Sequence, residues 1–127
     1  MKENIVQEKS YAFALRVIDL TRWLRKQREH EIATQLLRAG TSIGANVEEA
    51  LAGISRADFI AKMSIASKEA REAHYWLRLV RDSKIGPCKQ ADSLLVEADE
   101  LLRILTAIVK SAQSIQNSKS KIKNSDV

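Results

Sequence analysis

The sequence predicts an all-α protein, an antiparallel up-down-up-down four-helix bundle. Apolar residues recur at spacings of three and four along four long segments. Short connections, marked by charged residues or by glycine and proline, separate these segments. The chain has few aromatic residues (5%) and one proline, which is more typical of helices than of strands. Short connections favour this bundle over a three-helix core with a swapped helix or a domain-swapped dimer.

The first helix is predicted over about residues 5–27 and carries two apolar stripes. The first stripe comprises Val6, Phe13, Val17, Leu20 and Leu24. At about 100° per residue, a second group falls on nearly the opposite side, namely Tyr11, Leu15 and Ile18. A helix in a single core needs only one stripe, so we expect the second group to lie between subunits of an oligomer.

The second helix is predicted over about residues 31–52, and Gly53 is expected to end it in the left-handed cap conformation. It contains Gly40 and Gly44, one turn apart. Because neither residue has a side chain, they would let the first helix or a neighbouring molecule approach closely.

The third helix is expected to begin at Ser55, a good N-cap residue, with Asp58 at the capping-box position. Away from its inner stripe lies a second apolar group, Ile65, Trp76 and Leu79. This group is a further candidate for an oligomer interface, since head-to-tail rings bring two unlike surfaces together.

The fourth helix is predicted over about residues 89–115, after Gly86 caps the preceding helix and Pro87 begins the new one. The bundle domain is therefore expected over residues 1–116. The remaining segment, 117–127, is polar and rich in lysine, and is expected to be disordered.

Composition limits the compartment and the chemistry. The 127 residues fit one domain. The lone Cys88 excludes an internal disulfide and favours a reducing, cytoplasmic location. The beginning of the chain lacks the apolar segment of a signal peptide, and no apolar run is long enough to cross a membrane.

Neither histidine fits the Glu-x-x-His pattern of carboxylate-bridged metal bundles, since His74 follows Arg71 and His30 follows Gln27 at that spacing. Phosphate-binding glycine motifs are also missing from the sequence. We therefore expect no enzyme activity, no cofactor and no metal.

One polar group is expected to be structural. Asn46 and Glu49 share a face of the second helix, Glu72 stands on the third, and Arg38 can pair with these acids. The group could bind a cation or a substrate, but a network that joins helices two and three is the preferred interpretation.

A basic group is the candidate for nucleic-acid binding, because the chain has a net charge of +5 and a pI of about 9.5. Its members lie in and after the later half of the first helix: Arg16, Arg22, Arg25, Lys26 and Arg28. Interspersed acids allow the alternative of an ordinary solvated face. Repetition in a symmetric ring would nevertheless strengthen weak phosphate contacts.

Residues 35–80 resemble the four-helix bundle proteins known as the 23S rRNA intervening sequence protein family. The family's Gln-Leu-x-Arg-Ala start is matched by Gln35, Leu36, Arg38 and Ala39. Its Ser-Ile-x-x-Asn-Ile-x-Glu-Gly segment is matched by Ser42, Ile43, Asn46, Val47 and Glu49. In the third helix the matching residues are Phe59, Ala66 and Glu72. Ala50 replaces the usual glycine, and "ASKEARE" replaces Ala-x-Gly-Ser-x-x-Glu, which indicates a subfamily.

The resemblance implies a homopentamer of four-helix bundles without an established catalytic activity. It also implies a relation to the accessory variability protein of diversity-generating retroelements, a basic pentamer that binds nucleic acid and a reverse transcriptase. Two functions are therefore expected as alternatives: an oligomer that binds RNA or DNA through a repeated basic surface, or a protein-interaction scaffold that does not bind nucleic acid.

Overall fold

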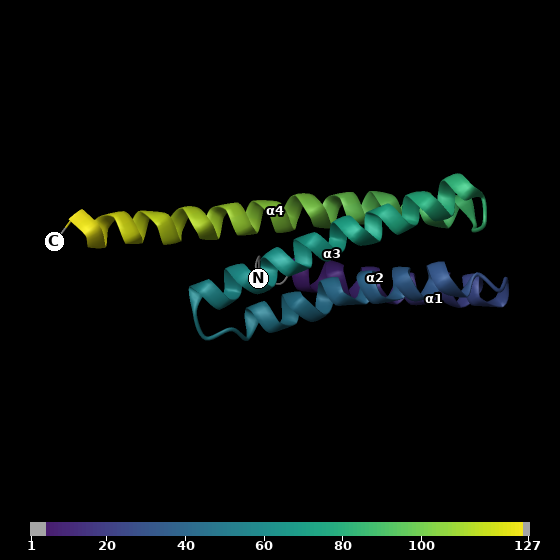
Figure 1. Ribbon diagram of the computed structural model, residues 1–127, viewed down its shortest axis with the longest axis horizontal. Helices are drawn as coiled ribbons and strands as arrows, with labels where there is room; N and C mark the ends of the chain where they lie inside the picture. Colours follow the sequence, from purple (N-terminus) through teal and green to yellow (C-terminus); the bar gives the residue numbers. More distant parts are fainter. Residues whose placement is uncertain (1–4, 126–127) are drawn as a thin grey trace.

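The computed structural model describes residues 5–125, which form four long helices (Figure 1). They are α1 (Ile5–Lys26), α2 (His30–Leu51), α3 (Arg56–Ser83) and α4 (Cys88–Ser125). α1 and α3 each pack against both α2 and α4, and successive helices run antiparallel. The predicted all-α, up-down-up-down four-helix bundle is therefore confirmed.

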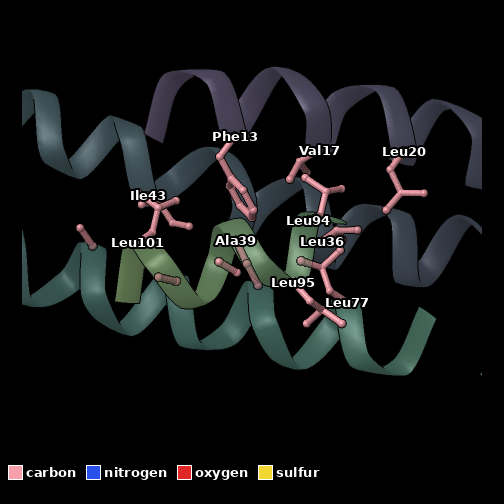
Figure 2. Close-up of a cluster of buried hydrophobic side chains, with 14 of the residues drawn as sticks. Phe13, Val17, Leu20, Leu36, Ala39, Ile43, Leu77, Leu94, Leu95 and Leu101 are labelled. Atoms are coloured by element: carbon pink, nitrogen blue, oxygen red, sulfur yellow. The ribbon is translucent and has the colours of Figure 1, made fainter. Parts of the chain in front are cut away.

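The core lies along the bundle axis and is formed by one apolar stripe from each helix. Figure 2 shows side chains from all four helices meeting there. From α1, the first predicted stripe is buried in full: Val6, Phe13, Val17, Leu20 and Leu24. Leu36 and Ile43 of α2, with Leu77 of α3, are equally inaccessible. Burial of these stripes supplies the main free energy that holds the helices together.

α1 and α2 approach closely where the two helical glycines lie. A Cβ atom added at Gly40 would stand 2.7 Å from Cγ1 of Val17. At Gly44 the nearest atoms belong to Ser10 of α1, at an ordinary contact distance of 3.5 Å. The close partner of both glycines is therefore α1 of the same chain, and only Gly40 is sterically required.

The helix ends differ from the prediction at both expected glycine caps. Neither Gly53 nor Gly86 has a positive φ. A Cβ atom at Gly53 would lie 2.6 Å from Oδ2 of Asp58, and one at Gly86 would lie 2.5 Å from a methyl group of Val80. These glycines therefore make room for a neighbouring side chain, and the left-handed caps occur elsewhere, at Arg28 (φ 64°) and Lys84 (φ 61°).

The N-terminus of α3 is capped as predicted. The backbone N–H of Asp58 donates a hydrogen bond of 3.0 Å to Oγ of Ser55, which has an extended backbone. We expect Ser55→Ala to lower the free energy of unfolding by about 1 kcal/mol, because the N–H loses its acceptor. Urea denaturation followed by circular dichroism measures this change, and Ser114→Ala, at an exposed position inside α4, is the control that should change little.

α4 extends beyond the bundle, where disorder was predicted. It continues as a helix to Ser125 and projects past the other three helices (Figure 1). After Pro87 the sequence contains neither glycine nor proline, so nothing in its local chemistry ends the helix. The segment 117–127, predicted to be disordered, is thus helical over 117–125 in the structure, and residues 126–127 lie outside the described part. None of the described helices is long and apolar enough to cross a membrane.

Candidate functional site

The predicted polar group is only partly brought together. Arg38 of α2 forms an ion pair with Glu72 of α3, and its guanidinium lies 3.3 Å from Oε2 of Glu69. The indole N–H of Trp76 also donates a hydrogen bond of 3.2 Å to Glu72. Glu72 is thus held by one cation and one neutral donor, and this contact joins α2 to α3 at the surface of the bundle.

The other two members of the group lie apart from Glu72. Nδ2 of Asn46 donates a 2.8 Å hydrogen bond to the carbonyl oxygen of Ser42, within its own helix. Glu49 forms a separate ion pair of 3.3 Å with Lys62 of α3. The four residues therefore make two α2–α3 links and one local contact, an arrangement that aligns the helices. Surface pairs of this kind each contribute little to stability.

The predicted basic group divides in a similar way. Arg16 pairs with Glu97 of α4 and donates a 3.0 Å hydrogen bond to Oγ of Ser93, so it serves the α1–α4 contact. The remaining residues lie at one end of the bundle, and all but the half-buried Arg25 are exposed: Arg22, Arg25, Lys26 and Arg28.

The structure adds cations from the second half of the chain to the same end. The α1–α2 and α3–α4 connections lie together there (Figure 1), and a Cβ atom at Gly86 would be 3.6 Å from Leu24 of α1. This packing places Lys84 and Lys89, both exposed, at the end that carries Lys26. We call the set Arg22, Arg25, Lys26, Arg28, Lys84 and Lys89 the basic end. Neither lysine was predicted to belong to the basic group, because the position of both follows from the antiparallel topology.

Nearby Arg81 is less available to an external anion. Its Nε lies 2.7 Å from Oδ1 of Asp82. The hydrogen bond from Arg81 lowers the pKa of the Asp82 carboxyl, which stays charged at neutral pH and offsets the guanidinium. Arg81 is accordingly not counted as part of the basic end.

Two residues of the basic end occupy strained backbone positions. Arg28 follows α1 in the left-handed conformation, with the N–H of Glu29 bonded to the carbonyl of Leu24 at 2.9 Å. Lys84 has the same conformation after α3. Glycine is the usual residue at such helix ends, and another residue there costs roughly 1–2 kcal/mol. Both positions carry a cation at this cost, and backbone strain of this kind is concentrated at functional sites.

The second apolar stripe of α1 is uncovered in the single chain. Tyr11 is 64% exposed and Leu15 is 50% exposed, whereas Ile18 is half-buried. These three residues form what we call the α1 outer face. It is the side of α1 that faces away from both α2 and α4.

The corresponding group on α3 is less uniform. Ile65 and Leu79 are exposed, but Trp76 is half-buried and packs against the core. Beside Trp76, Tyr75 is exposed, with the two rings in an edge-to-face arrangement at 5.2 Å between centroids. We therefore define the α3 outer face as Ile65, Tyr75 and Leu79. Tyr75 was not among the predicted interface residues.

An apolar cleft lies at the end of the bundle opposite the basic end. It has a volume of about 600 Å³. All four helices line it, through Ile5, Val6, Leu51, Phe59, Met63, Ile104 and Ile108. Among the described residues no cluster of three or more histidine, cysteine or acidic side chains could hold a metal ion. Cys88 is exposed and unbridged.

The molecule is thus a helical bundle with a basic end, two apolar outer faces and an apolar cleft. The family model of the 23S rRNA-intervening sequence protein matches residues 2–107. The chain belongs to this family. The match to the family model ends within α4, before the part of that helix that projects beyond the bundle.

A solved structure agrees with this assignment. It is the crystal structure of a protein of unknown function from the S23 ribosomal protein family of Bacteroides thetaiotaomicron. The two chains are 41% identical, with a TM-score of 0.81, over 87% of this chain and 99% of that chain. The comparison with curated proteins found no match.

Proposed function

We propose that this protein is a non-enzymatic homo-oligomer that binds nucleic acid through its basic end. The observation that carries the proposal is the gathering of six cations from both halves of the chain at one end of the bundle, two of them at left-handed positions. Such a surface suits the phosphate backbone, which is recognised by charge and with little regard to sequence.

The two outer faces support self-association. Tyr11 and Leu15 on α1, with Ile65 and Leu79 on α3, are apolar groups that a monomer would expose to water. The faces differ from each other, so contact of one with the other is head-to-tail, the type of contact that forms a ring when the rotation between neighbouring copies closes. A pentamer is the number implied by the family resemblance. In a ring each basic end would be repeated, and several weak contacts would act together.

Binding of the intact protein to labelled RNA and DNA as a function of salt tests the proposal. The triple variant Arg22→Gln, Lys26→Gln and Lys89→Gln is expected to make the negative slope of log K against log salt shallower by about three, one for each lost phosphate contact. The matched control neutralises three exposed cations outside the basic end, Lys68, Arg103 and Lys110. Equal losses in the two variants, or no binding by the wild type at low salt, would contradict the proposal.

The strained position of Arg28 offers a separate prediction. Arg28→Gly is expected to raise the free energy of unfolding by about 0.5–1 kcal/mol, because glycine adopts the left-handed conformation without strain. The same variant should bind nucleic acid more weakly, since it loses a charge. Arg28→Ala is the control, which loses the charge but keeps the strain. Thermal denaturation and binding titration of both variants measure the two effects, and unchanged affinity in both would remove Arg28 from the interface.

The apolar cleft favours a second candidate function, a protein-interaction scaffold that does not bind nucleic acid. Exposed Leu51 and Ile5 at its mouth would suit an apolar helix of a protein partner. Co-purification of a partner that resists nuclease and is lost with Leu51→Lys would support this function. Release of all co-purified material by nuclease would instead favour nucleic-acid binding through the basic end.

A further inference from the structure

The basic end contains an exposed aromatic side chain that the charges alone do not explain. Trp23 is 38% exposed, whereas Trp76 is half-buried and packs against the core. Within the described residues its indole N–H has no hydrogen bond, whereas that of Trp76 donates to Glu72. The exposed part of this ring offers a flat apolar surface on which a ligand can pack.

The register of α1 against α4 places Trp23 at the basic end. Lys9 of α1 pairs with Glu100 of α4 at 2.9 Å. Arg16, seven residues further along α1, donates a hydrogen bond to Ser93, which lies seven residues before Glu100 in α4. A further seven residues along α1 and seven residues back from Ser93 place Trp23 opposite Gly86, next to the beginning of α4. The ring therefore lies on the side of α1 that faces the α3–α4 connection.

Three cations lie near this position in sequence and register. Arg22 precedes Trp23 directly, Lys26 lies one turn later on α1, and Lys89 lies in the first turn of α4. Asp19, one turn before Trp23, is exposed and offsets one of these charges. An aromatic ring among cations is the surface that proteins present to single strands, where an unpaired base stacks on the ring and phosphates meet the cations.

We propose that Trp23 is a stacking platform for an unpaired base, and that the basic end therefore prefers single-stranded nucleic acid over a duplex. The inference rests on the proposed nucleic-acid binding and narrows its ligand class. A duplex keeps its bases stacked inside the helix, so it can reach the cations but cannot place a base on the indole.

Binding of a single-stranded oligothymidylate and of a duplex of equal length to the full chain tests this inference. Trp23→Ala is expected to weaken single-strand binding by about 5- to 150-fold, the range for loss of one stacked base. Duplex binding should change by less than about twofold, since phosphate contacts remain. Trp23→Phe keeps a stacking ring and should retain most single-strand affinity.

Tryptophan fluorescence provides an independent readout. The single strand should quench the wild type but not Trp23→Phe, in which Trp76 alone emits. Circular dichroism and native mass show whether each variant remains folded and assembled.

Four outcomes would overturn the inference. Single-strand affinity unchanged in Trp23→Ala, or quenching that persists in Trp23→Phe, would overturn it while nucleic-acid binding stands. A Trp23→Ala variant with altered native mass would instead assign the ring to a contact between copies. A wild type that binds neither probe at low salt would overturn both this inference and the proposed function.

Discussion

Replacement of Leu15 by glutamate is expected to convert the native assembly into a particle of the monomer mass, 14.3 kDa. Leu15 lies at the centre of the α1 outer face and is half exposed in the single chain. In the proposed ring, a neighbour would cover this side chain and remove a carboxylate placed there from water. Burial of an unpaired charge costs several kcal/mol. Because every interface of the ring contains this contact, every interface would be weakened by the same amount. Light scattering at micromolar concentration measures the mass.

A matched variant separates assembly from folding. Val96 of α4 is 68% exposed and lies on neither outer face, so Val96→Glu should keep the wild-type mass. Leu15→Glu itself should retain helical content, because the core stripe of α1 is unchanged. If the wild type already scatters as a 14.3 kDa monomer, the outer faces are not an interface and the ring is excluded.

Gly40→Ala is expected to destabilise the fold by about 1–2 kcal/mol, although alanine favours helix. The new methyl group would lie 2.7 Å from Cγ1 of Val17, a side chain that is itself fully buried and branched at Cβ. Such overpacking typically costs about 1–3 kcal/mol, which exceeds the gain of up to about 1 kcal/mol from helix propensity. Chemical denaturation of the purified variant measures the difference.

Gly44→Ala is the natural comparison, since it lies one turn away on the same face. Its Cβ atom would meet Ser10 at 3.5 Å, an ordinary contact, so we expect a gain of about 0.5–1 kcal/mol. In the double variant Gly40→Ala with Val17→Ala, the clash is removed, so part of the lost stability should return. The recovery is incomplete because alanine at position 17 buries less apolar surface than valine. Equal effects of the two single glycine variants would contradict the close approach at Gly40.

The difference between the two glycines shows the limit of sequence reasoning at this site. The pattern of two glycines one turn apart predicts close packing, but it does not identify the partner or the tighter position. That depends on which α1 side chain faces each glycine, Val17 in one case and Ser10 in the other. The polar group is a similar case. The spacing predicts that Asn46 and Glu49 share one face of α2, but the register of α2 against α3 determines that Glu49 forms its ion pair with Lys62.

The periodic apolar stripes determined the helices and the core, and the short connections determined their antiparallel order, because neighbouring helices joined by a few residues must run in opposite directions. The sequence also revealed the surplus apolar face of α1, since Tyr11 and Leu15 cannot point inward when Phe13 does. Only the tertiary structure decided the composition of the basic end. Lys84 and Lys89 are far from Lys26 along the chain, and the α3–α4 connection brings them to it. Helical periodicity is local, whereas a surface site depends on which ends of the helices meet.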